Sequence, residues 1–211
     1  MFSAICLLLS PHPGSFLSEL AIHRLGRGTA ARYNSTMGNE RVLELTDYFD
    51  RIRERTMRVV ACVPPEKLDW TYGPGKFTLG DLMRHIASIE RWMFAENARL
   101  KPSSYPGHGP DLSDGYDEIV AFMKLMHSES MEIFRSLSDS DLEAKCVTPG
   151  GVALRVGKWL RAMIEHEVHH RGQLYLYLAM LDVPTPPLYG LTEEEVHARS
   201  KAESRKQKAE M

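Results

Sequence analysis

Apolar residues recur at helical spacing in four long segments of the 211-residue chain. We expect helices over residues 40–63, 78–100, 116–137 and 158–181, because steps of three and four place the apolar side chains of each segment on one face. A charged segment from residue 193 also looks helical, but its apolar face is thin. The pattern predicts an all-α fold, a four-helix bundle with a short charged C-terminal helix.

Capping and turn residues separate these segments. Thr78 and Asp81 occupy the two positions of a capping box, which would begin the second helix. Stretches rich in proline and glycine at residues 102–114 and 149–151 predict a long loop and a short hairpin. We find no internal repeat and no long alternating strand pattern, so nothing competes with the helical interpretation.

The two ends of the chain differ from this regular middle. The first ten residues, MFSAICLLLS, are apolar, but no basic residue precedes them as in a secretory signal. Arginines further along faintly suggest a transit peptide, yet we interpret residues 1–36 as a disordered N-terminal extension or a misplaced start. We therefore expect the bundle to span residues 37–187 and a charged, partly helical tail to span residues 188–211.

Composition points to one cytoplasmic domain that acts on a small molecule or a protein. The 26 basic and 28 acidic residues give a net charge of -2, which offers no electrostatic reason to bind nucleic acid or a membrane surface. No apolar run reaches the roughly 18 residues of a membrane span. Three scattered cysteines argue against a disulfide scaffold and against a cysteine-based zinc site.

Three histidines fall at core positions of two predicted helices. His166 and His170 lie one turn apart on the apolar face of the last helix, in register with Trp159, Met163, Leu174, Tyr177 and Leu181. His85 follows the apolar register of the second helix with Leu82, Ile89 and Trp92. A buried imidazole without a partner costs about 1–3 kcal/mol, so three of them require an explanation.

Two explanations fit these histidines. Each could be bonded separately to a carboxylate or a carbonyl in the core, or all three could hold one metal ion. We favour the metal site, because two ligands from one helix and a third from a facing helix leave open positions for water or substrate, as catalytic zinc sites require.

Residues 166–170, HEVHH, also match the H-E-x-x-H pattern of zinc proteases. Such an enzyme would use Glu167 as general base and take its third ligand downstream. The metzincin extension fails, because Gln173 and Leu176 stand where glycine and histidine are required. Glu167 also lies about 100° around the helix from His166, and no strand pattern precedes the helix. The protease interpretation is therefore disfavoured.

Two motifs resemble the DinB-like superfamily, which includes YfiT-type metal-dependent hydrolases and thiol-dependent transferases. They are the loop and helix start WTYGPGKFTLGDLMRH at residues 70–85 and the run HEVHHRGQ at residues 166–173, which fits H-x-x-H-H-R-G-Q. The resemblance covers about residues 39–187. It implies an up-down-down-up four-helix bundle, frequent homodimers, and a divalent metal held by three histidines, which are here His85, His166 and His170.

The resemblance leaves the chemistry open among several classes. We expect a metal-dependent enzyme that activates a low-molecular-weight thiol for transfer to an electrophile. Alternatives are a hydrolase that uses metal-bound water, a non-enzymatic metal-binding stress protein, and a bundle without metal. Zinc is the first expectation, with nickel or iron as alternatives. Cys62 and Cys146 lie away from the histidine register, so no protein nucleophile is indicated and no catalytic residue is named.

Neighbouring residues carry lesser expectations. We expect Glu167 to be a solvated charge and Arg171 to form a surface or interface ion pair. Gln173 would bond across to a neighbouring helix. Trp70 would line the mouth of the site, because its loop leads into the helix that carries His85.

Overall fold

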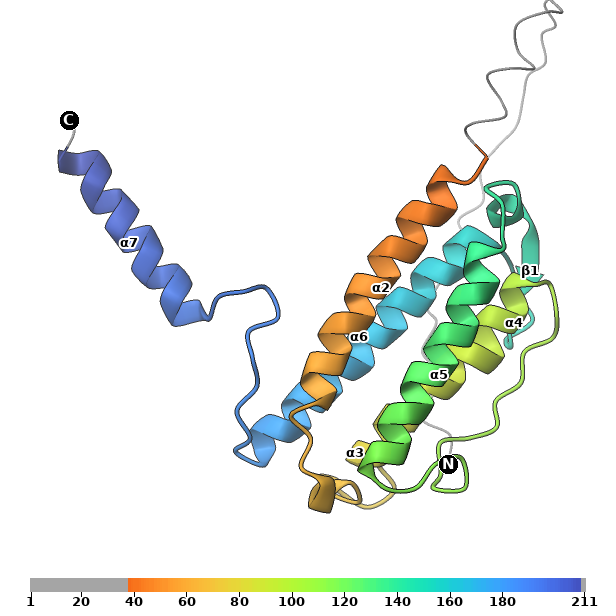
Figure 1. Ribbon diagram of the computed structural model, residues 1–211, viewed down its shortest axis with the longest axis horizontal. Coiled ribbons are helices and arrows are strands. Elements are labelled where there is room, and N and C mark those ends of the chain that lie inside the picture. The colour runs from red at the N-terminus through yellow and green to blue at the C-terminus, as the bar shows by residue number, and fades with distance from the viewer. Residues whose placement is uncertain (1–37, 210–211) are drawn as a thin grey trace, which may run out of the picture. The chain divides into compact units, whose positions relative to one another are not determined.

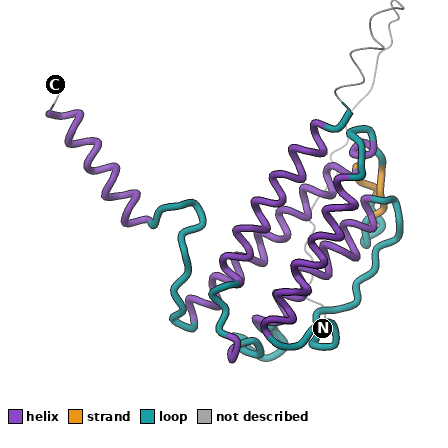
Figure 2. Tube along the Cα trace, viewed as in Figure 1, coloured by secondary structure: helices purple, strands orange, loops and turns teal. Residues whose placement is uncertain are grey.

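The computed structural model describes residues 38–209, and the expectation for residues 1–36 lies outside this range. Figures 1 and 2 show a helical molecule with one small two-stranded hairpin. The helices are α2 (Glu40–Val60), α3 (Leu79–Ile89), α4 (Ala95–Ala98), α5 (Tyr116–Arg135), α6 (Val156–Met180) and α7 (Glu193–Ala209), and the strands are β1 (Lys145–Val147) and β2 (Ala153–Arg155).

Four helical rods form the bundle, with α3 and α4 joined into a single rod. In Figure 1, α2 and α6 run in one direction, whereas α3–α4 and α5 run in the other. The long connection over residues 99–115 allows two consecutive rods to run the same way. This confirms the expected all-α bundle of up-down-down-up type. No helix within residues 38–209 is long and apolar enough to cross a membrane.

The core consists of two apolar clusters along the bundle. One contains Phe49, Phe134 and Trp159, and the other contains Leu82, Met123 and Leu174. Each cluster draws side chains from all four rods, so the apolar face that periodicity predicts on each helix is covered by its neighbours. Helix α7 also begins where the sequence predicted, and its side chains over residues 193–208 are exposed.

The expected capping box begins α3. The Thr78 hydroxyl accepts a hydrogen bond from the Asp81 backbone N–H, and the Asp81 carboxylate accepts one from the Thr78 N–H, both at 3.0 Å. The start of α3 is also held by two backbone hydrogen bonds, which the N–H groups of Leu79 and Gly80 donate to carbonyls of the preceding loop. The start of the helix that carries His85 is therefore fixed.

The expected second helix is interrupted by a π-helical turn, Glu90–Phe94, between α3 and α4. A π turn adds one residue to the helical repeat, so it rotates the residues that follow it. Trp92, expected on the core face, is half-buried, whereas Met93 and Phe94 are buried. The same turn includes Glu90, which is only 2% exposed.

The hairpin predicted around residues 149–151 is present. Strands β1 and β2 pair antiparallel with Cys146 opposite Leu154, and Gly151 adopts a positive φ of 77° in the turn. Helix α6 starts directly after β2, at Val156. The hairpin therefore leads straight into the helix that carries His166.

A buried ion cluster links α2, the π turn and α6. The Nη2 atom of Arg53 donates to Glu90 and, at 2.9 Å, to Glu167 Oε2, and all three side chains are buried. Burial raises the pKa of the Glu167 carboxyl, while the Arg53 charge opposes this shift. The expectation of a solvated Glu167 is wrong, because its partner comes from a different helix that periodicity cannot reveal.

Replacing Arg53 tests this cluster. We expect Arg53→Met to lower the free energy of unfolding by about 3–5 kcal/mol, because Glu90 and Glu167 would stay buried without their cation. Urea unfolding measures the change. The control is Arg135→Met, which removes a pair with Asp50 whose arginine side chain is 52% exposed, and should cost less than about 1 kcal/mol. Equal losses in both variants would contradict the importance of the buried cluster.

Candidate metal centre

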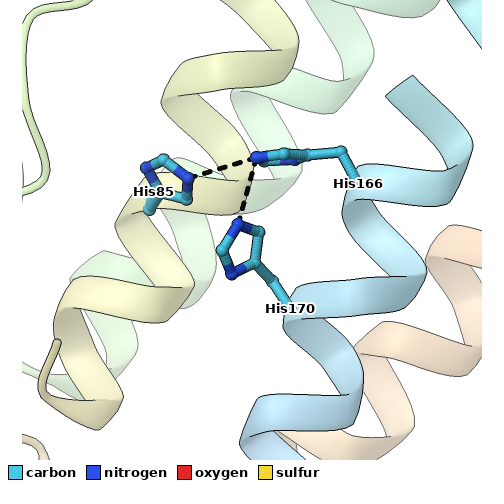
Figure 3. A group of neighbouring side chains, drawn as sticks. All are labelled: His85, His166 and His170. Carbon is cyan, nitrogen blue, oxygen red and sulfur yellow. Dashed lines mark hydrogen bonds between the residues drawn. The ribbon is translucent and has the colours of Figure 1, made fainter. Parts of the chain in front are cut away.

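The structure brings the three predicted histidines together. The Nε2 atom of His166 lies 3.2 Å from Nε2 of His85 and 3.0 Å from Nε2 of His170. Figure 3 shows the ring of His85 on α3 pointing toward the two rings on α6. One nitrogen from each residue lies within 4.8 Å of the others. The three Nε2 atoms therefore face a common point.

This donor set suits a divalent metal ion. Three imidazoles from two helices can occupy one side of an ion and leave its remaining positions open. His85 and His170 are each 8% exposed, whereas His166 is half-buried and is the member of the trio most open to solvent. Imidazole nitrogen binds zinc, nickel, copper and iron alike, so the donors do not select among these metals.

The environment keeps all three rings neutral. Burial and, to a smaller extent, the neighbouring imidazoles lower the pKa of His85 to about 2, of His166 to about 3 and of His170 to about 4. For His170, the bond to Gln173 opposes the effect of burial. Neutral imidazole is the form that binds a metal, so the site needs no proton release from these rings near pH 7.

Gln173 orients the ring of His170. Its side-chain oxygen lies 2.7 Å from His170 Nδ1 and accepts the N–H there, which leaves the Nε2 lone pair directed at the trio. The expectation that Gln173 bonds to a neighbouring helix is wrong. The two residues are three positions apart, so they meet on the same face of α6.

Sequence reasoning missed the residues that surround His85. The Tyr105 hydroxyl lies 2.7 Å from His85 Nδ1, and it is also 2.7 Å from His108 Nδ1. The Phe77 ring packs 5.0 Å from the His85 ring and 6.3 Å from the His170 ring. These residues lie in loops, where periodicity carries no signal. The only available hint was a tyrosine and a histidine three residues apart in the loop over residues 102–114.

Three other residues of the two sequence motifs are not part of the cluster, although the His169 ring packs edge-on 5.0 Å from the His170 ring. Trp70, expected at the mouth of the site, packs edge-on against the Tyr177 ring at 5.4 Å. His169 lines a separate pocket of about 670 Å³ between α2 and α6, which none of the three clustered histidines lines. Arg171, expected at the surface, is 3% exposed and donates to the Ile52 carbonyl, because α2 packs against its side of α6.

The geometry also argues against the protease interpretation. The Glu167 carboxylate, which would have to act as the general base, is bound to Arg53 in the core. The third nitrogen of the cluster comes from His85, upstream of the H-E-x-x-H match. The match therefore reflects the one-turn spacing of two core histidines.

Comparison with known proteins places this arrangement in a family. Residues 48–174 match the model of the DinB superfamily. The chain belongs to the DinB superfamily. The match begins within α2 and ends within α6, and includes all three clustered histidines. None of the curated proteins compared with the chain matches it.

Solved structures of DinB-like proteins share the fold. The crystal structure of a DinB-like protein from Bacillus cereus ATCC 10987 is 20% identical, with a TM-score of 0.60 over 68% of this chain and 94% of that one. A DinB-like protein from Bacillus subtilis, YjoA, is 14% identical, with a TM-score of 0.56 over 71% of this chain and 99% of that one. At these identities, the structural likeness supports only the fold of this DinB-superfamily protein.

The depressed pKa values predict how the stability of the metal-free DinB-superfamily chain depends on pH. The ordinary histidine value of 6.5 applies to the unfolded chain, while the folded trio titrates at about 2 to 4. Below pH 6.5 the unfolded chain binds more protons, so the free energy of unfolding should fall as the pH drops from about 6.5 toward 4.

Urea unfolding of chelator-treated protein between pH 7 and 5 measures this slope. We expect His85→Gln to flatten it, because that variant removes one buried ring. The matched control His197→Gln removes an exposed histidine of α7 and should leave the slope unchanged. An unchanged slope in His85→Gln would contradict the proposed neutral trio.

Proposed function

We propose that this DinB-superfamily chain is a metal-dependent enzyme that transfers a low-molecular-weight thiol to an electrophile. His85, His166 and His170 would hold the divalent ion, with zinc as the first expectation. The observation that carries the proposal is the convergence of one ring nitrogen from each histidine within 4.8 Å, on rings that burial keeps neutral.

The neutral ligand set suits the binding of an anion such as a thiolate. A divalent ion at such a site supplies Lewis acidity, which lowers the pKa of a thiol or a water molecule at an open position. Three imidazoles add no negative charge, so the site keeps the full charge of the ion. The half-buried His166 marks the side from which a small thiol would reach it.

The residues around the trio favour thiol transfer over hydrolysis. Within residues 38–209, the side chains hydrogen-bonded to the three histidines are Tyr105 and Gln173, together with the histidines themselves, and none is a carboxylate. Hydrolysis commonly uses a general base to take a proton from water during attack. A thiolate has already lost its proton, so its attack does not need that group.

The proposed reaction is a displacement at carbon. The sulfur of the thiolate forms a bond to the electrophilic carbon, the bond from that carbon to its leaving group breaks, and the leaving group departs with the electron pair. The proton of the thiol passes to solvent. The aromatic surface of Phe77 beside His85 and His170 would shield the reacting groups from water.

Metal content tests the ligand set. We expect the full chain, purified without a histidine tag, to bind about one divalent ion, and we expect His85→Ala to lose most of it. His169→Ala is the matched control, because it removes the exposed neighbour of His170 and should bind as the wild type does. Elemental analysis after reconstitution measures the ratio. Full occupancy in His85→Ala would show that the third ligand is wrong.

Turnover tests the reaction class. The metal-loaded chain should join thiols such as cysteine or glutathione to a chromogenic aryl halide, and activity should fall at least 100-fold after chelation or in His166→Ala. Release of halide that requires both thiol and metal would support the proposal. Ester cleavage without thiol would instead favour a hydrolase, and metal binding without either activity would favour a non-enzymatic metal-binding protein.

A further inference from the structure

A chain of hydrogen bonds leads from the back of His85 into the loop over residues 102–114. We propose that Tyr105 is a positioning residue for His85, and that His108 sets the direction of the hydrogen bond between them. The Tyr105 hydroxyl lies 2.7 Å from His85 Nδ1 and 2.7 Å from His108 Nδ1. One phenol therefore bridges two imidazoles.

Only one direction of these bonds prepares His85 to bind a metal. A free lone pair on Nε2 requires the proton of the neutral ring to be on Nδ1, which must then donate to the Tyr105 oxygen. The Tyr105 O–H then needs another acceptor, and His108 Nδ1 provides it. In the opposite direction the phenol would donate to His85, and the ring proton would be on Nε2, where it would block the site.

Helix α3, which carries His85, also holds the loop over residues 102–114 in place. Arg84, immediately before His85, donates from Nε to the His108 carbonyl at 2.7 Å and from Nη1 to the Ser113 carbonyl at 3.1 Å. Ser88 donates to the Gly107 carbonyl at 3.0 Å. Arg84 and Ser88 are buried, so these anchors are shielded from competing water. The loop and the ligand therefore form one supported unit.

The three histidines differ in how they are oriented. Gln173 orients His170 from within α6, whereas His85 depends on Tyr105 from a loop. Within residues 38–209, the His166 Nδ1 atom has no hydrogen-bond partner. Removal of the Tyr105 hydroxyl would leave only the ring of His170 oriented by a hydrogen bond. We therefore expect this change to lower metal affinity more than the same change at an exposed tyrosine that contacts no metal ligand.

Tyr105 acts on the ligand and not on the substrate. Its hydroxyl contacts Nδ1 of His85, on the side of the ring opposite the Nε2 atom that faces the trio. The inference rests on the metal centre of the proposed function but not on its thiol chemistry. It can therefore be tested by metal affinity and by ring protonation, without an activity assay.

Metal affinity of the full chain, measured by competition with a zinc chelator, tests the link. Tyr105→Phe should weaken binding about 10- to 100-fold. His108→Ala should weaken it less, and the double variant should bind no more weakly than Tyr105→Phe, because both changes break the same chain. Tyr48→Phe, which alters a tyrosine that is 52% exposed and whose hydroxyl has no hydrogen bond to the described residues 38–209, should bind as the wild type does.

A second readout does not depend on metal. Long-range ¹⁵N–¹H correlation spectra of the metal-free protein report which ring nitrogen of His85 carries the proton. The wild type should show the Nδ1–H form, and Tyr105→Phe should show a mixture with the Nε2–H form. Identical ring protonation in both proteins, additive losses in the double variant, or affinity in Tyr105→Phe within twofold of the wild type would overturn the inference. Wild-type protein that shows the Nδ1–H form but binds no metal would overturn the metal centre instead.

Discussion

The Arg53 ion cluster is the interaction on which the geometry of the site depends. Arg53 comes from α2, yet its two partners lie on the two rods that carry the histidines. Glu167 is the neighbour of His166 on α6, and Glu90 opens the π turn that directly follows α3. A buried guanidinium that bonds one oxygen of each carboxylate through Nη2 ties these rods together. This constraint acts on the two rods that place His85 and His166 3.2 Å apart.

The π turn and the ion cluster require each other. Trp92 in the turn is half-buried and packs against the apolar cluster that contains Leu82, whereas Met93 and Phe94 are buried. Glu90 is buried with its carboxylate on Arg53 and, at 2.8 Å, on His127. A carboxylate buried like that of Glu90 is tolerated only because the Arg53 guanidinium and the His127 ring bond to it. The helix is therefore irregular at the point where it joins the cluster.

Much of the fold and the centre of the site could be predicted from the sequence, for reasons that are local. Helical spacing identifies the rods, the Thr78–Asp81 pair fixes the start of α3, and the core register places His85, His166 and His170 on facing surfaces. These features depend on neighbours in sequence. The partners of Glu167 and Arg171, and the position of Tyr105, depend on other helices and on loop backbone bonds, which no spacing rule encodes.

The H-E-x-x-H match shows why spacing alone misassigns chemistry. In a zinc protease the glutamate must reach the metal, whereas here the buried Glu167 carboxylate is bound to Arg53 of α2. Within HEVHH, the imidazoles of His166 and His170 face the site, whereas the negative charge of Glu167 does not. A cation bound to the trio would keep its full charge, and the ligand that completes it best would be an anion. The position of the Glu167 carboxylate therefore distinguishes this site from a water-activating protease site.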